Sequence, residues 1–594
     1  LKFDFIGQDS VRTNHFYYKL SEDSPQCLNP NFYSARIKYP DGWKGDKYVA
    51  LSDFFIKAAD TKKQISKDPL DNIVAFNGGA YNSDCLIAWM DEEKAYRENF
   101  PLAFYKGQNF KHLNFRMDKA MKHSLLDELQ RPDIDLFMFH EHGLPTKQVI
   151  NNERTGDKFE ERLRLVKTYL YHSLQKMVAA GKNEDSLKQI LIEKYHLTDA
   201  FFKELHLDSF WKNDSIISAD VYLTPEDLSG VATYPKIVLF NACYNGSFQD
   251  DDYLAAYYLF NRGNTVVAQG NTRNVLQDRW TIELIGLLSH GVRVGQYNRL
   301  IATLEGHLMG DPTARFAPII TDLKLDADIE LKQGQSDYWS KLISVPYADI
   351  QSLTLRMIVD ADSLCTNANE ILNIFKSTSW NTVRMEALKL LGRYNNACFT
   401  EAVHMGIGDS YELIARHSAN YAGEIGDPVL LPALIREWID GGERQRVGYI
   451  INSVLPLFPQ NEVECAIDEF YRQTERTNAL EEQIQVKKIL NRKFAMVEQI
   501  NAKIKNEKLP VTERIAAIRM LRNNPYHCYV LDYLDLLACK ETPVKVRVAM
   551  AEALGWFVHS QERIRILEGC RKLLQTDLPD ELYLELQQTI KRLI

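Results

Sequence analysis

Two reactive side chains each follow a short apolar run, and their types are those of a nucleophile and its base. His142 closely follows the run 136–139, and Cys243 closely follows the run 237–240. Each run has the length and composition of a fully buried strand. Because ligands bind where the carboxyl ends of parallel strands meet, we expect the imidazole and the thiol to share one edge of a sheet. A base beside a thiol is the minimum equipment of a cysteine nucleophile.

The residues next to this pair suit acyl transfer. A cysteine attacks as a thiolate, so His142 would accept the thiol proton and later return it to the leaving amine. Gly143 allows a close backbone approach, and its N–H together with that of Cys243 would hold the oxyanion of a tetrahedral intermediate. Gly246 permits a tight turn after the thiol. We therefore predict Cys243 and His142 as the catalytic residues, with backbone oxyanion donors at Gly143 and Cys243.

The elements that must position these residues belong to an α/β region over residues 1–320. Helical patterns separate several of its apolar runs, which favours a largely parallel sheet. The stretch 155–210 is helical and highly charged, and we expect an insertion above the active edge rather than a simple crossover. The expected strands are 48–51, 73–76, 102–105, 136–139, 237–240 and 265–268, with helices over 84–99 and 251–261 among them.

The C-terminal region, 376–594, has a different texture, in which amphipathic helices dominate. Similar segments recur there, each opened by an arginine, at intervals of 32, 30, 68 and 33 residues, and 68 is close to two periods. A repeat of this length made of paired helices predicts an all-α solenoid. We take residues 321–375 as a segment that connects the two regions. The arginines are Arg384, Arg416, Arg446, Arg514 and Arg547.

Composition narrows the function classes. The chain has 594 residues, of which 45% are hydrophobic and 25% charged, as expected for several folded domains. A formal net charge of −9 argues against a nucleic-acid binder with a basic surface, and no apolar stretch approaches the ~20 residues of a membrane span. The nine cysteines include no CxxC pair, so neither a zinc ribbon nor a disulfide framework is indicated. The chain begins at Leu1 without a signal peptide, so we expect a processed or truncated product.

The two motifs resemble those of a known clan of peptidases. A hydrophobic block ending in His-Gly at 142–143, and a second ending in Ala-Cys at 242–243, resemble the caspase–gingipain clan of cysteine peptidases. The sequence Cys-Tyr-Asn-Gly-Ser-Phe at 243–248 looks like the gingipain branch, and so does Gly-Asp-Pro at 310–312. The similarity covers residues from about 70 to 316.

This resemblance implies a caspase-like α/β fold, endopeptidase activity on a polypeptide substrate, no cofactor or catalytic metal, and a secreted or periplasmic bacterial protein. In the family, the positions that match His142 and Cys243 form the catalytic dyad. The C-terminal repeats are similar to HEAT repeats, for example at 423–427 and 553–555, and replace the immunoglobulin-like domain usual in gingipains. We expect them to bind a protein partner or the substrate. The His–Cys interval is longer than the family norm, which leaves substrate preference open.

Residues that would set this preference are harder to identify. Gingipains prefer a basic residue before the scissile bond, which requires an acid in the pocket, and Asp84 and Asp91 precede the histidine strand. The loop after the strand 265–268 contains Asn271, which would line the pocket, and Arg273, which would instead favour acidic substrates. We predict Asp84 and Asn271 as pocket residues and leave the choice of substrate charge open.

Two other classes of function stay open. The first is a catalytically inactive peptidase-fold scaffold that binds a protein partner through the helical repeats. The second is a zinc-dependent hydrolase, because His140 and His142 lie on the same side of a strand end. Such an enzyme needs further ligands at later strand ends, and His290 and His307 are the candidates in the α/β region. We favour the thiol hydrolase, without metal, nucleic acid or a membrane span.

Overall fold

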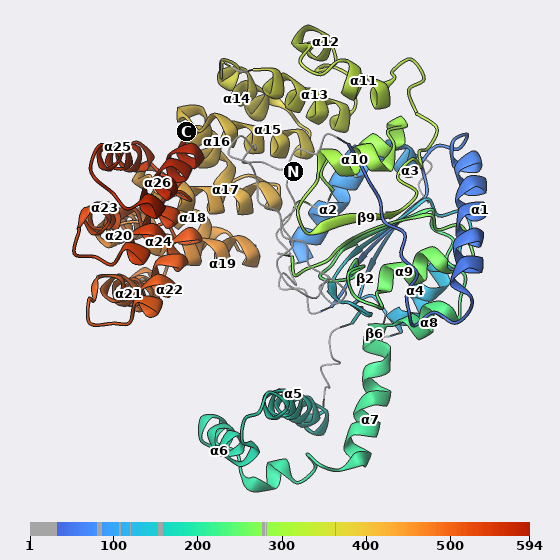
Figure 1. The fold of residues 1–594 in the computed structure, drawn as a ribbon, viewed down its shortest axis with the longest axis horizontal. Coiled ribbons are helices and arrows are strands. Elements are labelled where there is room, and N and C mark those ends of the chain that lie inside the picture. The colour runs from blue at the N-terminus through green and yellow to red at the C-terminus, as the bar shows by residue number, and fades with distance from the viewer. Residues whose placement is uncertain are drawn as a thin grey trace. The chain divides into compact units, whose positions relative to one another are not determined.

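The computed structural model divides the chain into two compact units (Figure 1). The α/β unit takes Leu1–Asp84 and Asn99–Leu331, and the helical unit takes Cys85–Glu98 and Lys332–Ile594. Of residues 86–88, 217 and 218 only the backbone is described. The structure describes residues 32–79, 86–105, 109–118, 120–151, 158–275, 280, 282–362, 364–442 and 444–594.

A six-stranded sheet is the centre of the α/β unit. Its strands are β1 (Ile73–Asn77), β2 (Phe110–Asn114), β3 (Leu136–His140), β7 (Ile237–Asn241), β8 (Val267–Asn271) and β9 (Gly306–Gly310). Their order is β2-β1-β3-β7-β8-β9. The first five strands are parallel, and β9 runs antiparallel to β8. The largely parallel sheet that the sequence predicts is therefore confirmed.

The apolar runs of β3 and β7 form the middle of this sheet and are buried along their length. Because helices cover both faces of a largely parallel sheet, the side chains of a central strand are buried whichever face they point to, and each apolar one stabilises the core. Phe137 stacks on Phe139 with ring centroids 4.4 Å apart, and Phe139 stacks on Phe240 at 5.6 Å. The helices of this unit include α1 (Lys47–Ile65), α4 (Met121–Leu129), α8 (Pro225–Ser229), α9 (Leu254–Phe260), α10 (Val294–Leu300) and α11 (Leu325–Leu331).

Two segments expected as strands are helices. The segment 48–51 lies in α1, where the Asp46 side chain accepts hydrogen bonds from the first backbone N–H groups of the helix. The segment 102–105 lies in α3 (Pro101–Tyr105), which starts with proline at the position that proline favours. Both expectations are wrong, because signals at the helix start outweigh a four-residue apolar run.

A second, smaller sheet follows β3. It contains β4 (His142–Leu144), β5 (Lys147–Val149) and β6 (Tyr222–Leu223), all antiparallel, with β5 in the middle. The expected insertion begins after β5 and ends at β6, the strand that pairs with β5. Both ends of the insertion are therefore fixed at the hairpin that carries His142.

The insertion is helical, as its charged pattern indicates, and it extends beyond the expected end at residue 210. Its main helices are α5 (Phe159–Ala179), α6 (Glu184–Tyr195) and α7 (Asp208–Ser218). These helices bury an apolar cluster of their own, so the insertion has a separate small core. That cluster contains Leu170, Tyr171, Leu174, Leu187, Leu191, Phe202 and Leu205.

In the helical unit, most helices pack against a second neighbour along the chain as well as a first, which gives a solenoid-like stack of two rows (Figure 1). Within the described residues, no helix has the length and apolar composition that crossing a bilayer requires. The helices are α12 (Ser336–Ser340), α13 (Ala348–Ala361), α14 (Ala368–Ser377), α15 (Asn381–Tyr394), α16 (Ala397–Ile407), α17 (Glu412–Ile425), α18 (Leu431–Asp440), α19 (Gln445–Val454), α20 (Gln460–Gln473), α21 (Ala479–Lys505), α22 (Val511–Arg519), α23 (Val530–Ala538), α24 (Val544–Leu554), α25 (Arg563–Leu573) and α26 (Asp580–Leu593).

The five recurring arginines fall on α15, α17, α19, α22 and α24, one on each. Arg514 and Arg547 make the same contact: each Nε donates to the backbone carbonyl ten residues earlier, Ile504 at 2.9 Å and Leu537 at 2.8 Å. These carbonyls lie in the last turn of the preceding helix, where no intrahelical donor is left. The double interval between Arg446 and Arg514 holds α20 and the 27-residue α21.

The segment 321–375 is more ordered than a connection. It contains α11, α12, α13 and most of α14, and the helical unit begins at Lys332. The helix α13 is buried on nearly every side, so it lacks the alternation of apolar and polar faces that marks the later repeats. This is why the sequence pattern alone leaves its place open.

One helix belongs to a different unit from its neighbours in the sequence. α2 (Leu86–Asn99) follows β1 in the chain, yet its residues as far as Glu98 are part of the helical unit. The chain therefore passes between the units at three points: before Cys85, after Glu98 and after Leu331.

Candidate active site

The register of the sheet brings the ends of β3 and β7 to the same level. His140 pairs with Asn241, and the backbone N–H of Glu141 donates to the Asn241 carbonyl at 3.3 Å. His142 and Cys243 each lie two residues beyond this matched pair. Because neighbouring strands are only about 4.8 Å apart, both residues start from adjacent points of one edge.

Gly143 is the point at which the two segments touch. A Cβ on this glycine would overlap the backbone carbonyl oxygen of Cys243, and it would lie 2.5 Å from the Oδ1 atom of Asn245. The residue after His142 therefore packs directly on the cysteine backbone. This is a stronger requirement for glycine than the one the sequence suggests, because any side chain would separate the histidine hairpin from the cysteine loop.

Asn245 joins the same two segments by hydrogen bonds. Its Nδ2 atom donates to the carbonyls of Leu144 at 2.7 Å and Lys147 at 3.0 Å, the two residues that flank the turn of the hairpin. The side chain is fully buried. Because a buried amide that loses its acceptors is costly, these bonds fix the hairpin on the loop that follows Cys243.

The thiol of Cys243 is half-buried and free. The backbone N–H of Val275 donates to its Sγ atom at 3.3 Å, and the thiol contacts the Val275 carbonyl at 3.6 Å. Tyr244, the next residue, has φ of 58°, a left-handed conformation that is uncommon for a side chain of this size. Within the described residues the Cys243 N–H donates no hydrogen bond.

Of the two predicted pocket residues, Asn271 is described and Asp84 lies outside the described residues. Asn271 ends β8 and is buried, and its Nδ2 atom donates to the carbonyl of Ala242 at 2.9 Å. The same nitrogen also donates to the Phe240 carbonyl at 3.4 Å, so this side chain bonds to the backbone of the segment that leads to Cys243. Of the alternatives, Asp91 lies in α2 of the helical unit, and Arg273 is exposed on the loop beside the thiol.

A glycine pair holds the cysteine loop on β8. A Cβ on Gly246 would meet the backbone of Gly270, and a Cβ on Gly270 would meet that of Gly246. The N–H of Gly246 donates to the Asn271 carbonyl at 3.0 Å. The predicted turn after the thiol is therefore also a site of close backbone approach.

Glu141 lies between the two histidines in sequence, and its carboxyl group is directed elsewhere. Gln148 on β5 donates from Nε2 to the Glu141 Oε1 atom at 2.5 Å, and the Tyr258 hydroxyl donates to Gln148 Oε1 at 2.6 Å. Complete burial raises the pKa of Glu141 well above its usual value, against the opposing effect of the Gln148 bond. Burial therefore favours the protonated form of this carboxyl group, which links β5 to the segment between the two histidines.

A row of polar residues marks the edge, and of its members the sequence analysis singled out only His140. Asn77 pairs with Asn114 on one side and with His140 on the other, and His140 pairs with Asn241. Each residue is the last of its strand, so the row lies where the apolar core gives way to the site. The available signal is a polar residue directly after each apolar run, most often asparagine.

The zinc alternative can be examined from the same geometry. His140 ends β3 and is buried, His290 is buried in a 3₁₀ helix (Ile285–His290), and His307 lies on β9. Burial, followed by the charge of Arg36, lowers the pKa of His307. Across the described part of the chain, no three His, Cys, Asp or Glu side chains gather in a way that would hold a metal ion.

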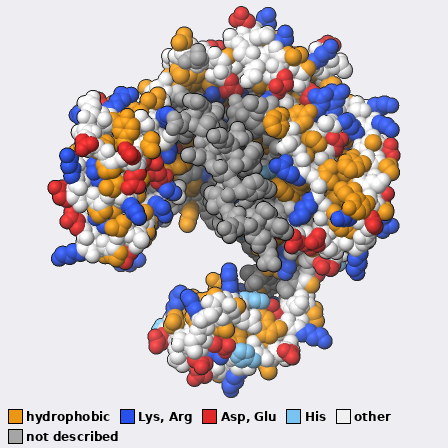
Figure 2. All heavy atoms as spheres, viewed as in Figure 1, with side chains coloured by type: hydrophobic (Ala, Val, Ile, Leu, Met, Phe, Trp, Pro, Cys, Tyr) orange, Lys and Arg blue, Asp and Glu red, His pale blue; other side chains and the backbone are white. Residues whose placement is uncertain are grey.

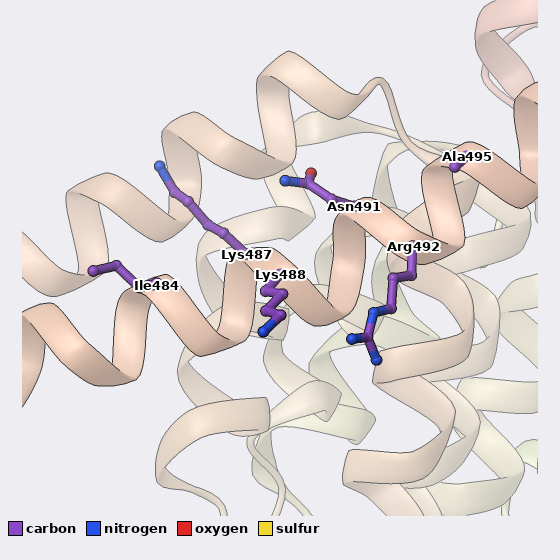
Figure 3. Close-up of a pocket in the computed structure, with 6 residues that line it drawn as sticks. All are labelled: Ile484, Lys487, Lys488, Asn491, Arg492 and Ala495. Atoms are coloured by element: carbon purple, nitrogen blue, oxygen red, sulfur yellow. The ribbon is translucent and has the colours of Figure 1, made fainter.

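A separate hollow of about 690 Å³ lies along α21 in the helical unit (Figure 3). Acidic and basic side chains are interspersed over this unit in the face that Figure 2 shows. The hollow combines apolar with cationic groups, and its lining comes from a single helix. Its lining residues are Ile484, Lys487, Lys488, Asn491, Arg492 and Ala495.

Comparisons with known proteins leave the family open. No family model matches the chain, and no curated protein matches it at a significant level. Among solved structures, human deoxyhypusine hydroxylase in complex with glycerol is similar at 15% identity, over 39% of this chain and 96% of that chain, with a TM-score of 0.17.

Proposed function

We propose that this protein is a cysteine endopeptidase of the gingipain type, with Cys243 as nucleophile and His142 as general base and acid. The observation that carries the proposal is the contact of Gly143 with the Cys243 carbonyl. In this contact the backbone of Gly143, next to His142, packs against the backbone of Cys243. The contact lies at the carboxyl edge of a parallel sheet, where active sites of such sheets lie.

The proposed reaction has two steps. In the first, the Cys243 sulfur attacks the peptide carbonyl carbon, a C–S bond forms, the C–N bond breaks, and His142 passes the thiol proton to the leaving amine. In the second, His142 takes a proton from water, the hydroxide oxygen bonds to the carbonyl carbon, and the thiol leaves with its proton restored. The N–H groups of Cys243 and Gly143 stabilise the oxyanion in both steps.

A peptidyl ketone that alkylates active-site thiols tests the assignment. Mass spectrometry should find the label on Cys243 in the wild type, no label at that position in C243A, and slower labelling in H142A. Cys398 is a matched control, because it is another half-buried free cysteine, and C398A should label as the wild type does. Equal labelling of C243A and wild type would remove the nucleophile from the proposal.

The inactive scaffold predicts a different pattern. An enzyme of this type should cleave members of a diverse peptide library, and C243A should not. If the wild type and C243A both leave the whole library intact, the scaffold replaces the peptidase. Metal analysis of the purified protein tests the zinc hydrolase directly.

The family resemblance gives the proposal its setting. We propose a caspase-like fold for the α/β unit and HEAT-like repeats for the helix stack, supported by the parallel sheet and by the recurring arginines of α15, α17, α19, α22 and α24. Export to the periplasm or the medium follows from the same resemblance.

For the repeats we propose a polypeptide partner with an acidic and apolar segment. Leu480, Ile484 and Met496 of α21 are strongly exposed, and Lys488 and Arg492 have no ion-pair partner among the described residues. Exposed apolar side chains next to unpaired cations fit a chain of the opposite charge.

A further inference from the structure

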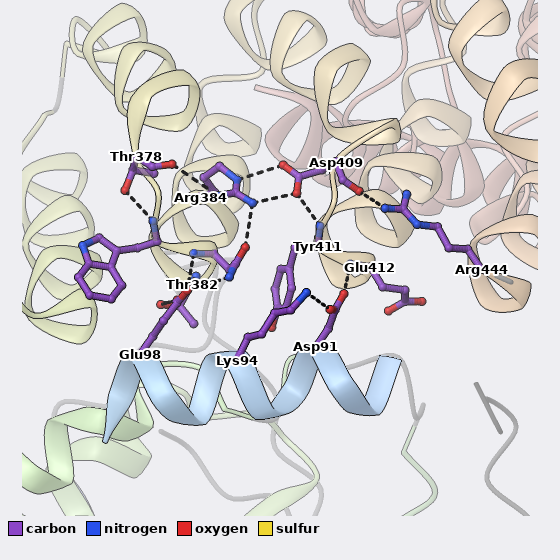
Figure 4. Close-up of polar contacts among 12 residues, drawn as sticks. Asp91, Lys94, Glu98, Thr378, Thr382, Arg384, Asp409, Tyr411, Glu412 and Arg444 are labelled. Atoms are coloured by element: carbon purple, nitrogen blue, oxygen red, sulfur yellow. Dashed lines mark hydrogen bonds and ion pairs between the residues drawn. The ribbon is translucent and has the colours of Figure 1, made fainter. Parts of the chain in front are cut away.

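The helix α2 is seated on the helical unit by two carboxylates, each at the start of a different helix (Figure 4). Glu98 caps α15: its Oε1 atom accepts from the backbone N–H of Asn381 at 2.9 Å and from its Nδ2 atom at 2.8 Å. Its Oε2 atom accepts from the backbone N–H and the hydroxyl of Thr382, both at 2.8 Å. Asp91 caps α17 by accepting from the backbone N–H of Glu412 at 2.7 Å.

These carboxylates satisfy groups that the helices leave open. The first N–H groups of a helix have no partner within it, and the helix dipole favours negative charge there. Neither α15 nor α17 has a side-chain cap from its own preceding residue, Trp380 or Tyr411. The caps come instead from a segment about 300 residues earlier in the chain.

The spacing of the two acids matches the spacing of the two helices. Asp91 and Glu98 are seven residues apart, so they lie on the same side of α2, about 10 Å from each other along its axis. α15 and α17 are neighbours in one row of the stack, and packed helices have axes about 8–10 Å apart. One helix can therefore reach both starts at once.

Further hydrogen bonds connect the two helix starts that Glu98 and Asp91 cap. Arg384 donates to the side-chain oxygen of Asn381 at 2.9 Å and to both carboxylate oxygens of Asp409, at 2.9 and 3.0 Å. Asp409 in turn accepts from the backbone N–H of Tyr411 at 2.8 Å. Burial raises the pKa of Tyr411 well above its usual value. The surrounding carboxylates, of which Glu98 has the largest effect, raise this pKa further. The starts of α15 and α17 are thus connected by one chain of polar contacts.

We propose that the starts of α15 and α17 form a receptor for an acidic helix, and that the seating of α2 there, rather than the single peptide link after Leu331, holds the helical unit to the rest of the protein. Because α2 is joined to the α/β unit at both of its ends, a cut in the link leaves it attached to the N-terminal fragment. That fragment then keeps hold of the C-terminal one through the receptor. The inference does not depend on peptidase activity.

The experiment cuts the full chain after folding. A recognition sequence for a specific protease is inserted after Gly334, which is exposed in a turn. After cleavage, the wild-type fragments should elute together from a sizing column. E98Q should raise the dissociation constant of the fragments about tenfold or more, because the new amide presents a donor to the Thr382 N–H. E93Q alters another carboxylate of the same helix, which pairs with Arg97 at the surface, and should match the wild type.

A variant in α15 distinguishes loss of the contact from misfolding of α2. T382V keeps the backbone N–H and removes the hydroxyl that bonds to Glu98, so it should also weaken association, and adding it to E98Q should have less effect than adding it to the wild type. Uncut E98Q and T382V should retain the circular dichroism of the wild type. Fragments that separate in the wild type, or an E98Q protein that associates as tightly as E93Q, would overturn the proposal.

Discussion

The side-chain amide of Asn245, two residues after Cys243, donates a 2.7 Å hydrogen bond to the backbone carbonyl of Leu144, two residues after His142. A second bond from the same nitrogen reaches Lys147, across the turn. The hairpin of His142 and the loop of Cys243 are therefore joined by buried hydrogen bonds from a side chain that takes no part in the proposed reaction.

Replacing Asn245 by alanine should misalign the site. The carbonyls of Leu144 and Lys147 would lose their buried donor, at about 1–3 kcal/mol of unfolding free energy. In the peptidase, kcat should fall much more than KM changes, since alignment of the thiol and imidazole matters most in the transition state. N274A removes an exposed asparagine from the neighbouring loop and should leave both constants unchanged. An N245A enzyme with wild-type kcat would contradict the positioning role.

Gly143 should tolerate no side chain. In G143A the new methyl group would overlap the Cys243 carbonyl oxygen, a backbone atom that moves only with its loop. We expect a loss of about 1–3 kcal/mol in unfolding free energy and slower labelling of Cys243 by the peptidyl ketone. The control is G230A, where the nearest atom to the new methyl would be the Asp227 carbonyl oxygen at 3.4 Å. Equal labelling rates in the two variants would show that the close approach has no functional weight.

Glu141 should make the stability depend on pH. Because burial raises its pKa in the folded state above the unfolded value near 4.5, its contribution is fully present below that value and is lost as pH rises through the folded pKa. E141Q puts a neutral amide of the same shape in place of the carboxyl group. The unfolding free energy of E141Q relative to wild type should therefore rise with pH above about 4.5, as chemical denaturation at several pH values would reveal. A difference that stays constant across this range would mean that Glu141 is charged in the fold.

The helical insertion should be removable. The N–H of Ile150 donates to the Val221 carbonyl at 2.8 Å, so the two ends of the insertion already lie side by side. Replacing residues 152–219 by a short Gly-Ser linker should keep β5 paired with β6 and keep Cys243 open to the probe, because closing a short loop is inexpensive. A longer deletion that also removes β5 and β6 should abolish labelling. Loss of labelling with the conservative junction would assign the insertion to the site itself.

The exposed side of α21 should bind acidic peptides. Fluorescence anisotropy with a labelled acidic, apolar peptide should show binding that weakens as salt increases, and K488E/R492E should reduce the affinity about tenfold. K503E changes the same charge on the same helix, outside the hollow, and should have a much smaller effect. Identical affinities for the two variants would rule out this surface.

The sequence was most informative where local patterns coincide with burial. The runs 73–76, 136–139 and 237–240 are strands, and the register that follows from their parallel packing brings His142 and Cys243 to one edge. The helices expected over 84–99 and 251–261 are present as α2 and α9. In each case a local signal and the fold agree, so short-range reasoning was sufficient.

Other features depend on partners that a local pattern cannot reveal. β2 is half-exposed at the sheet edge, and β9 begins and ends with glycine, so neither has the apolar run of a central strand. Asn245 is an ordinary turn residue until the hairpin lies against it. Glu98 looks like a solvated helix acid, and only the fold gives it the start of α15 as a partner.

The origin of α2 in the N-terminal half also constrains the order of biosynthesis. When this segment leaves the ribosome, the residues that it caps, Thr382 and Glu412, have yet to be made, and nearly 300 more amino acids must follow. At about 5–20 residues per second this takes on the order of a minute or less, during which the nascent helix has no receptor. The α/β unit can close its sheet in that time, but the last contacts of the molecule must wait for the chain to emerge well beyond its midpoint.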